Sequence, residues 1–155
     1  DCIAGIKGLD YFWKYFYLSN YFLTKMGLEI SVEKKERIDA ALNGRLVTDI
    51  IALRALKDGS VKGHCDLFFE DESPGQKMVD GYLVSQEAGS GIPRALISRM
   101  SEELQRFAKT RKMTVIHRVE FDSSESAIKL PHILEEIGYR RTENGEICFY
   151  RVYDA

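Results

Sequence analysis

Two glycines separated by one residue lie in the stretch VSQEAGSGIPRALI, residues 84 to 97, and could support the binding of a phosphate group. An apolar run precedes them, and a run with helical spacing follows. Glycine lets the backbone bend sharply, and the N–H groups at the start of a helix attract anions. The stretch lacks both the G-x-G-x-x-G of dinucleotide-binding folds and the Lys of a Walker A loop. The sequence therefore predicts an anion-binding loop of another type.

The elements that would position this loop are a strand before it and a long helix after it. Alternating apolar residues and short turns predict an antiparallel meander of three strands, at Val47 to Leu56, Val61 to Glu70 and Lys77 to Ser85. A stripe of apolar residues predicts the helix over Pro93 to Thr110. The strand Met113 to Phe121 follows it, and such a strand–helix–strand step is usually a parallel crossover.

Further elements are predicted on both sides of this segment. We expect two helices ahead of the meander, Asp10 to Met26 and Val32 to Leu42. A shorter helix is expected within Ser126 to Ile137, and then a hairpin of Tyr139 to Arg141 with Ile147 to Val152. The order predicts a mixed α/β (α+β) fold, with one domain over residues 1–155 and one central sheet flanked by helices.

The overall composition excludes several classes of function. The 155 residues carry a net charge of -2, which argues against a general nucleic-acid binder. No apolar run approaches the roughly 20 residues that would span a membrane. The three cysteines, Cys2, Cys65 and Cys148, form no C-x-x-C pair, so we expect reduced thiols, a cytoplasmic location and no metal site.

The six residues Gln86-Glu87-Ala88-Gly89-Ser90-Gly91 fit the pattern Q/R-x-x-G-x-G/A. This motif resembles the acyl-CoA pyrophosphate loop of the GNAT family of N-acetyltransferases. The stretch GSGIPRALISRMSEELQRFAKTRKMTVIHRVEF resembles the family's loop, long helix and next strand, and SESAIKL with EEIGYR resembles the segments after it. The resemblance covers roughly residues 78 to 140. It implies a GNAT-like sheet, in which the meander is followed by a parallel pair of strands that splay apart. The family's first strand would lie in Cys2 to Ile6.

The resemblance also implies a ligand, acetyl-CoA, as co-substrate for transfer of its acetyl group to an amine. The backbone near Leu83 and Val84 would hold the pantetheine arm and orient the thioester carbonyl. Ser124, which stands where the family has Asn, belongs to the same predicted CoA-binding set. The pyrophosphate would lie on the backbone amides of the loop, namely Gln86, Glu87, Ala88, Gly89, Ser90, Gly91 and Ile92.

The chain departs from the family where a Tyr near the CoA sulfur is expected. Direct counting places Pro131 there, and counting back from Gly138 places Leu134 there; neither side chain can donate a proton. The remaining candidates for proton transfer are Glu120, near the carboxyl end of its predicted strand, and His132. A non-catalytic CoA-binding sensor or interaction module of the same fold is therefore the alternative to an acetyltransferase.

Other residues have simpler structural interpretations. His117 shares the parity of the apolar residues in its strand and is most simply a core histidine, and Asp80 is most simply an exposed strand acid. The run EKKER, residues 33 to 37, is most simply a solvated helix face. The aromatic residues of the first helix favour a core position or the interface of a homodimer.

Overall fold

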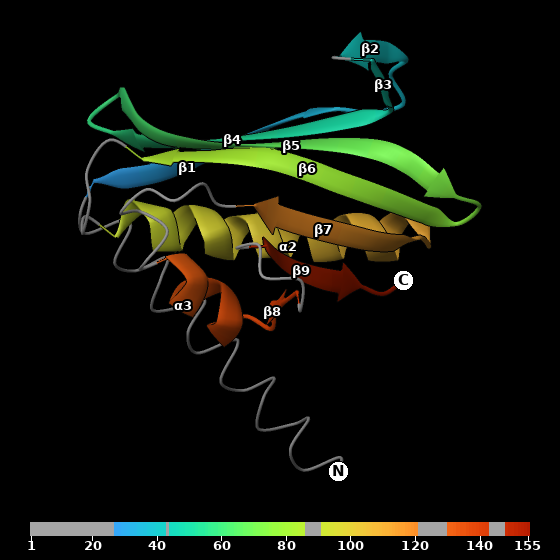
Figure 1. The fold of residues 1–155 in the computed structure, drawn as a ribbon. Coiled ribbons are helices and arrows are strands. Elements are labelled where there is room, and N and C mark those ends of the chain that lie inside the picture. Colours follow the sequence, from blue (N-terminus) through green and yellow to red (C-terminus); the bar gives the residue numbers. More distant parts are fainter. Residues whose placement is uncertain (1–26, 43, 86–90, 121–129, 143–147) are drawn as a thin grey trace.

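The computed structural model describes residues 27–42, 44–85, 91–120, 130–142 and 148–155 (Figure 1). Seven strands form one mixed sheet in the order β1-β4-β5-β6-β7-β9-β8, and two short strands form a separate hairpin. The two helices of the described residues lie below the strands β1, β4, β5 and β6 in Figure 1. In chain order the elements are β1 Leu28–Lys35, β2 Ala40–Leu42, β3 Arg45–Val47, β4 Asp49–Lys57, β5 Ser60–Ser73, β6 Gln76–Ser85, α2 Ile92–Arg111, β7 Thr114–Glu120, α3 Leu130–Glu136, β8 Arg140–Arg141 and β9 Cys148–Tyr153.

The predicted antiparallel meander is confirmed as β4, β5 and β6. β5 pairs with β4 on one side and with β6 on the other, both antiparallel. Alternate residues point to opposite faces of a strand, and in β5 it is Cys65, Leu67 and Phe69 that are buried. These side chains pack against α2, where Phe69 stacks on Phe107 with ring centroids 4.3 Å apart.

The long helix α2 and the crossover are also confirmed. The apolar stripe of α2 is buried against the sheet, and its Leu96, Leu104 and Ala108 have no exposed surface. After α2 the chain forms β7, which pairs parallel with β6. The sheet is therefore mixed, with an antiparallel meander followed by a parallel pair, as predicted.

The helix predicted over Val32 to Leu42 is wrong. Its first part belongs to β1, which pairs antiparallel with β4, and its last residues form β2 of the small hairpin. Leu28, Ile30 and Val32 alternate with polar residues, which is the period of a strand, and they pack on the core from the sheet edge. The charges of EKKER obscured this period, and that run is strand and loop instead of a solvated helix face.

The C-terminal elements complete the sheet. α3 ends before Gly138, which has a φ of 93°, and β8 then pairs antiparallel with β9. β9 also pairs antiparallel with β7, from Val115 to Glu120. This arrangement confirms the predicted shorter helix and final hairpin. The helix predicted over Asp10 to Met26, the strand within Cys2 to Ile6 and the turn of that hairpin lie outside the described residues.

Candidate functional site

The parallel strands β6 and β7 pair along only part of their length. Their register runs from Gln76 opposite Thr114 to Val79 opposite His117, and no further pair joins them in the described residues. β6 nevertheless continues to Ser85, held by β5, and β7 continues to Glu120, held by β9. The two strands therefore separate beyond Val79 and His117 (Figure 1), which confirms the predicted splay.

An open strand edge of this kind can bind an extended ligand. From Asp80 onward the β7-facing edge of β6 has no partner strand in the part of the chain that the structure describes. Backbone N–H and C=O groups along such an edge pair readily with amide groups of another molecule. A ligand with amides spaced along a flexible arm fits this gap by its chemistry.

The start of α2 is suited to an anion. Gly91 is the N-cap residue, with a φ of 78°, and no side chain caps the helix start with a hydrogen bond. The first turn carries no acidic residue, and nothing lies within 4 Å of the place where a Cβ on Gly91 would be. The helix dipole favours negative charge at this point, because the N–H groups of the first turn have no acceptor within the helix and point out of its N-terminal end.

The structure places some of the predicted CoA-binding residues. Leu83 and Val84 are paired with Cys65 and His64 of β5, on the splayed half of β6. The side chain of Ile92 is buried in the core, so only its backbone could meet a ligand. Gln86, Glu87, Ala88, Gly89, Ser90 and Ser124 lie outside the described residues.

The candidates for proton transfer come from two elements. The backbone of Glu120 pairs with Cys148 at the end of β7, on the splayed side. His132 is exposed on α3. Leu134, one of the two positions at which the family's Tyr is expected, is 1% exposed and belongs to the core. The roles of Glu120 and His132 in proton transfer remain predictions.

His117 is a core histidine, as its strand parity predicted. It is 2% exposed, and its Nδ1 lies 2.7 Å from the hydroxyl of Tyr139. That hydroxyl is 2.8 Å from the hydroxyl of Tyr153, which donates a hydrogen bond to Ser101 on α2. Burial lowers the pKa of His117 to about 3, so the imidazole is neutral at physiological pH. This chain of hydrogen bonds joins β7, β9 and α2 at the last paired rung before the splay.

A polar cluster that sequence reasoning missed lies on the sheet face opposite α2. Asp66 accepts a hydrogen bond of 2.7 Å from Arg54 and lies 3.0 Å from Nδ1 of His64. The signal was present in the sequence, because residues two apart in a strand share a face. A second missed pair joins Arg45 of β3 to Asp80 of β6.

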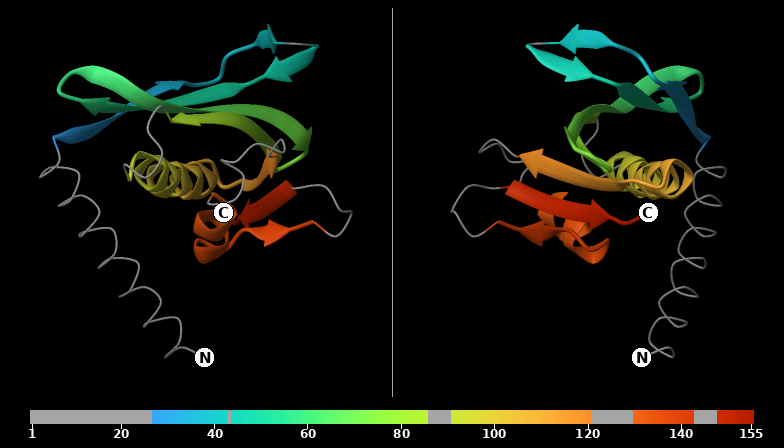
Figure 2. Two further views of the ribbon diagram at one scale, coloured as in Figure 1. Left: turned by 60° about the vertical axis from the view of Figure 1, so that its left-hand side comes forward. Right: turned by 90° about the vertical axis from the view of Figure 1, so that its right-hand side faces the viewer.

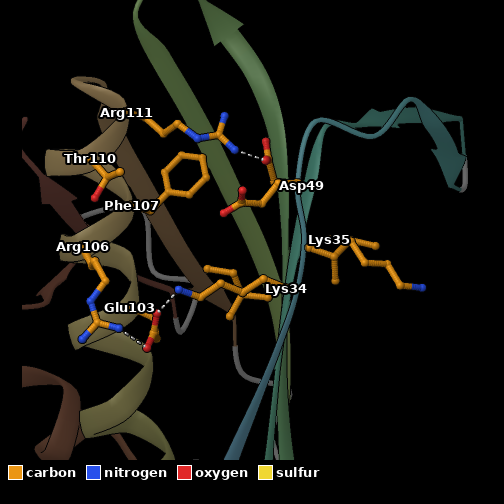
Figure 3. Close-up of a pocket in the computed structure, with 11 residues that line it drawn as sticks. Lys34, Lys35, Asp49, Glu103, Arg106, Phe107, Thr110 and Arg111 are labelled. Carbon is orange, nitrogen blue, oxygen red and sulfur yellow. Dashed lines mark hydrogen bonds and ion pairs between the residues drawn. The ribbon is translucent and has the colours of Figure 1, made fainter.

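A hollow at the other end of α2 is a structural ion-pair site (Figure 3). Glu103 is 1% exposed, and its carboxylate lies 2.9 Å from the ammonium of Lys34 on β1 and 2.8 Å from Arg106. Burial raises the pKa of Glu103, but Lys34, Arg106 and Arg99 together bring it below its ordinary value. Asp49 at the start of β4 pairs with Arg111 at 2.7 Å. These pairs attach α2 to the edge of the sheet.

The described residues offer neither a metal site nor an exposed thiol. They contain no group of three or more metal-ligating side chains, and Cys65 and Cys148 are free thiols in the interior. None of the helices in the described part of the chain is long and apolar enough to cross a bilayer.

Solved structures similar to this chain include acetyltransferases of the family that the motif resembles. One is an acetyltransferase of the GNAT family from Desulfovibrio desulfuricans, with 11% identity, 68% of each chain covered and a TM-score of 0.47. Another is an acyl-CoA N-acyltransferase from Pseudomonas aeruginosa, with 16% identity, 80% of this chain and 99% of that chain covered and a TM-score of 0.48. A third is an aminoglycoside acetyltransferase in complex with coenzyme A and kanamycin, with 16% identity, 66% of each chain covered and a TM-score of 0.41.

No protein-family model and no curated protein matches the chain. At identities of 11% to 16%, the likeness of these structures to the chain concerns the fold alone.

Proposed function

We propose that this protein binds acetyl-CoA between β6 and β7 and transfers the acetyl group to an amine. The observation that carries the proposal is the early end of the β6–β7 pairing. The parallel strands β6 and β7 form four residue pairs and then separate. β6 is the strand before α2, and the N-cap residue of α2 is Gly91. In this proposal the open edge of β6 would bind the pantetheine amides, and the start of α2 would bind the pyrophosphate.

The proposed reaction needs no covalent enzyme intermediate. The amine nitrogen attacks the thioester carbonyl, the new C–N bond forms and the C–S bond breaks. A backbone N–H near Leu83 or Val84 would stabilise the negative charge on the carbonyl oxygen. The nitrogen releases one proton as the amide forms, and the leaving thiolate takes up a proton to give the free thiol of CoA. Glu120 and His132 are the proposed groups for these two transfers.

A second function, a CoA-binding sensor without catalysis, is favoured by one observation. Leu134 is an apolar core residue at a position where the family resemblance leads us to expect a Tyr. A protein that keeps the loop and lacks a proton donor would bind acetyl-CoA without turning it over. A cytoplasmic location and a homodimer remain predictions from the sequence under both functions.

The first test is a calorimetric titration of the protein with acetyl-CoA, repeated with analogues that lack the pyrophosphate or the thiol. We expect saturable binding that requires the pyrophosphate. In the variant Gly89→Phe, binding should be lost, because a bulky side chain would fill the predicted pyrophosphate site. Gly44→Phe is the matched control. That turn glycine has a φ of +77°, so the substitution also strains the backbone there, but open space surrounds its Cβ position and it lies outside the proposed loop. Equal affinity of the two variants for acetyl-CoA would contradict the proposed loop.

The second test separates the enzyme from the sensor. Release of free CoA is measured with a panel of amines at saturating acetyl-CoA. If the protein is an acetyltransferase, Glu120→Gln or His132→Gln should lower kcat by about 100-fold or more. Acetyl-CoA binding without release of CoA for any amine would support the sensor.

A further inference from the structure

Asp80 is the first residue of β6 beyond its last rung with β7. That rung is Val79 opposite His117, so Asp80 stands at the point where the two strands begin to separate. The side chains of Lys77 and Val79 are buried on the α2 side. Because strand side chains alternate, Asp80 projects from the opposite face, at the mouth of the gap.

On this face Asp80 has apolar neighbours toward β4 and β7, and the Arg54–Asp66–His64 cluster lies next along β5. Its cross-strand neighbour is Phe68 of β5, and Phe68 stands opposite Ile50 of β4. Met78 precedes it by two residues and is paired with Ile116 of β7. All four apolar residues are half-buried on the face that α2 does not cover. A carboxylate among apolar side chains is suited to a ligand that has a positive charge on a hydrocarbon chain.

The carboxylate of Asp80 already binds one guanidinium group of this chain. Arg45 of β3 forms an ion pair with Asp80 across 35 positions of sequence. Arg45 comes from the β2–β3 hairpin, which stands off the sheet on the side away from α2 (Figure 2). Leu46, beside it, is 55% exposed, so the hairpin keeps an apolar side chain at its surface.

The Arg45–Asp80 pair differs from the other ion pairs of the sheet. The side chains are 58% and 42% exposed, whereas in every other ion pair of the described sheet residues one of the two partners is at most 18% exposed. Exposed ion pairs contribute little to stability, because water screens both charges. A second cation can therefore displace Arg45 at small cost.

We propose that Asp80 binds the ammonium group of a cationic alkyl amine, the acceptor, and that Arg45 holds this place until the acceptor displaces it. This inference rests on the proposed acetyltransferase function and names its substrate class. The alkyl chain of the acceptor lies along Phe68 and Met78, and its nitrogen lies beside the opening of the gap in which the thioester would be held. Before attack the bound ammonium releases one proton to water, and the neutral nitrogen loses its second proton as the amide forms. The β2–β3 hairpin, through Arg45, thus competes with the acceptor for Asp80.

The experiment is a calorimetric titration with n-pentylamine hydrochloride, with and without saturating CoA. n-Pentanol is the uncharged control ligand. We expect the wild-type protein to bind the amine in preference to the alcohol. Asp80→Asn should weaken amine binding by roughly tenfold or more, because a charge-assisted hydrogen bond is lost. Asp80→Glu should retain most of the affinity. Arg45→Gln should tighten amine binding about two- to fivefold, because the internal competitor is removed.

The matched control is Glu70→Gln, which removes a carboxylate from the same face of β5 without touching the Arg45 pair. It should leave the affinity for the amine unchanged. Equal amine affinity in wild type, Asp80→Asn and Arg45→Gln would overturn the proposal, as would absence of amine binding by the wild type. The acetyl-CoA titration tests the proposed function independently of the amine titration. If acetyl-CoA does not bind, the proposed function is refuted, and the amine titration without CoA still tests whether Asp80 binds an ammonium group. Thermal unfolding confirms that each variant is folded.

Discussion

Acidification should destabilise this protein through His117. The imidazole is buried, and its hydrogen-bonded neighbour Tyr139 is buried too, so the folded protein binds no proton there until the pH approaches about 3. The unfolded chain binds a proton at the ordinary histidine pKa of about 6.5. The folded-state pKa is depressed, so this stability is present above the unfolded pKa and is lost as the pH falls from there toward the folded pKa.

The size of the effect follows from proton linkage. Well below the unfolded pKa, the unfolded state holds one more proton than the folded state, so the free energy of unfolding falls by about 1.4 kcal/mol per pH unit. Between about pH 7.5 and pH 5, the loss due to His117 sums to about 2 kcal/mol. Buried carboxylates with lowered pKa values, such as Glu103, act only at lower pH.

The assay is urea unfolding followed by circular dichroism at several pH values, for wild type and His117→Gln. The variant loses the titrating group and has lower stability overall, so the two slopes against pH are compared instead of the absolute values. The wild-type slope between about pH 5 and 6 should exceed that of the variant by about 1 kcal/mol per pH unit. Equal slopes would refute the conclusion that a neutral, buried imidazole is held in the fold.

Three further predictions concern the framework around the site. Asp49→Ala should lower the free energy of unfolding by about 3–5 kcal/mol, because it leaves the largely buried Arg111 without its carboxylate; a loss below about 1 kcal/mol in urea unfolding would contradict this. Gly81→Ala should cost about 1–3 kcal/mol in the same measurement, because the added Cβ would lie 2.3 Å from the carbonyl oxygen of Asp66, and an unchanged midpoint would exclude that close approach. Burial raises the pKa of Cys65 to about 12, so peptide mapping after alkylation of the native protein should find it unmodified, and rapid native labelling would disprove its burial.

Much of the fold could be predicted because its patterns are local. β5 alternates apolar and polar side chains over much of its length, β4 is a run of mostly apolar residues before a turn, and α2 carries a continuous apolar stripe, so these local patterns identify them. β1 was missed because its charged second half suggested a solvated helix. Only pairing with β4 reveals that Leu28 and Ile30 face the core. An edge strand has one face and one side in contact with the protein, and its sequence signal is correspondingly weak.

The candidate site divides in the same way. The strand before the glycine pair and the helix after it could be predicted from the sequence, because they are consecutive along the chain and each has a local pattern. The tertiary structure was needed to show that β6 leaves β7 after four residue pairs, that Arg45 meets Asp80, and that His117 joins Tyr139 and Tyr153 in the core. Each of these depends on strand register and on contacts between residues far apart in sequence. A periodic pattern specifies which face of an element is buried, but it does not specify which distant residue that face will meet.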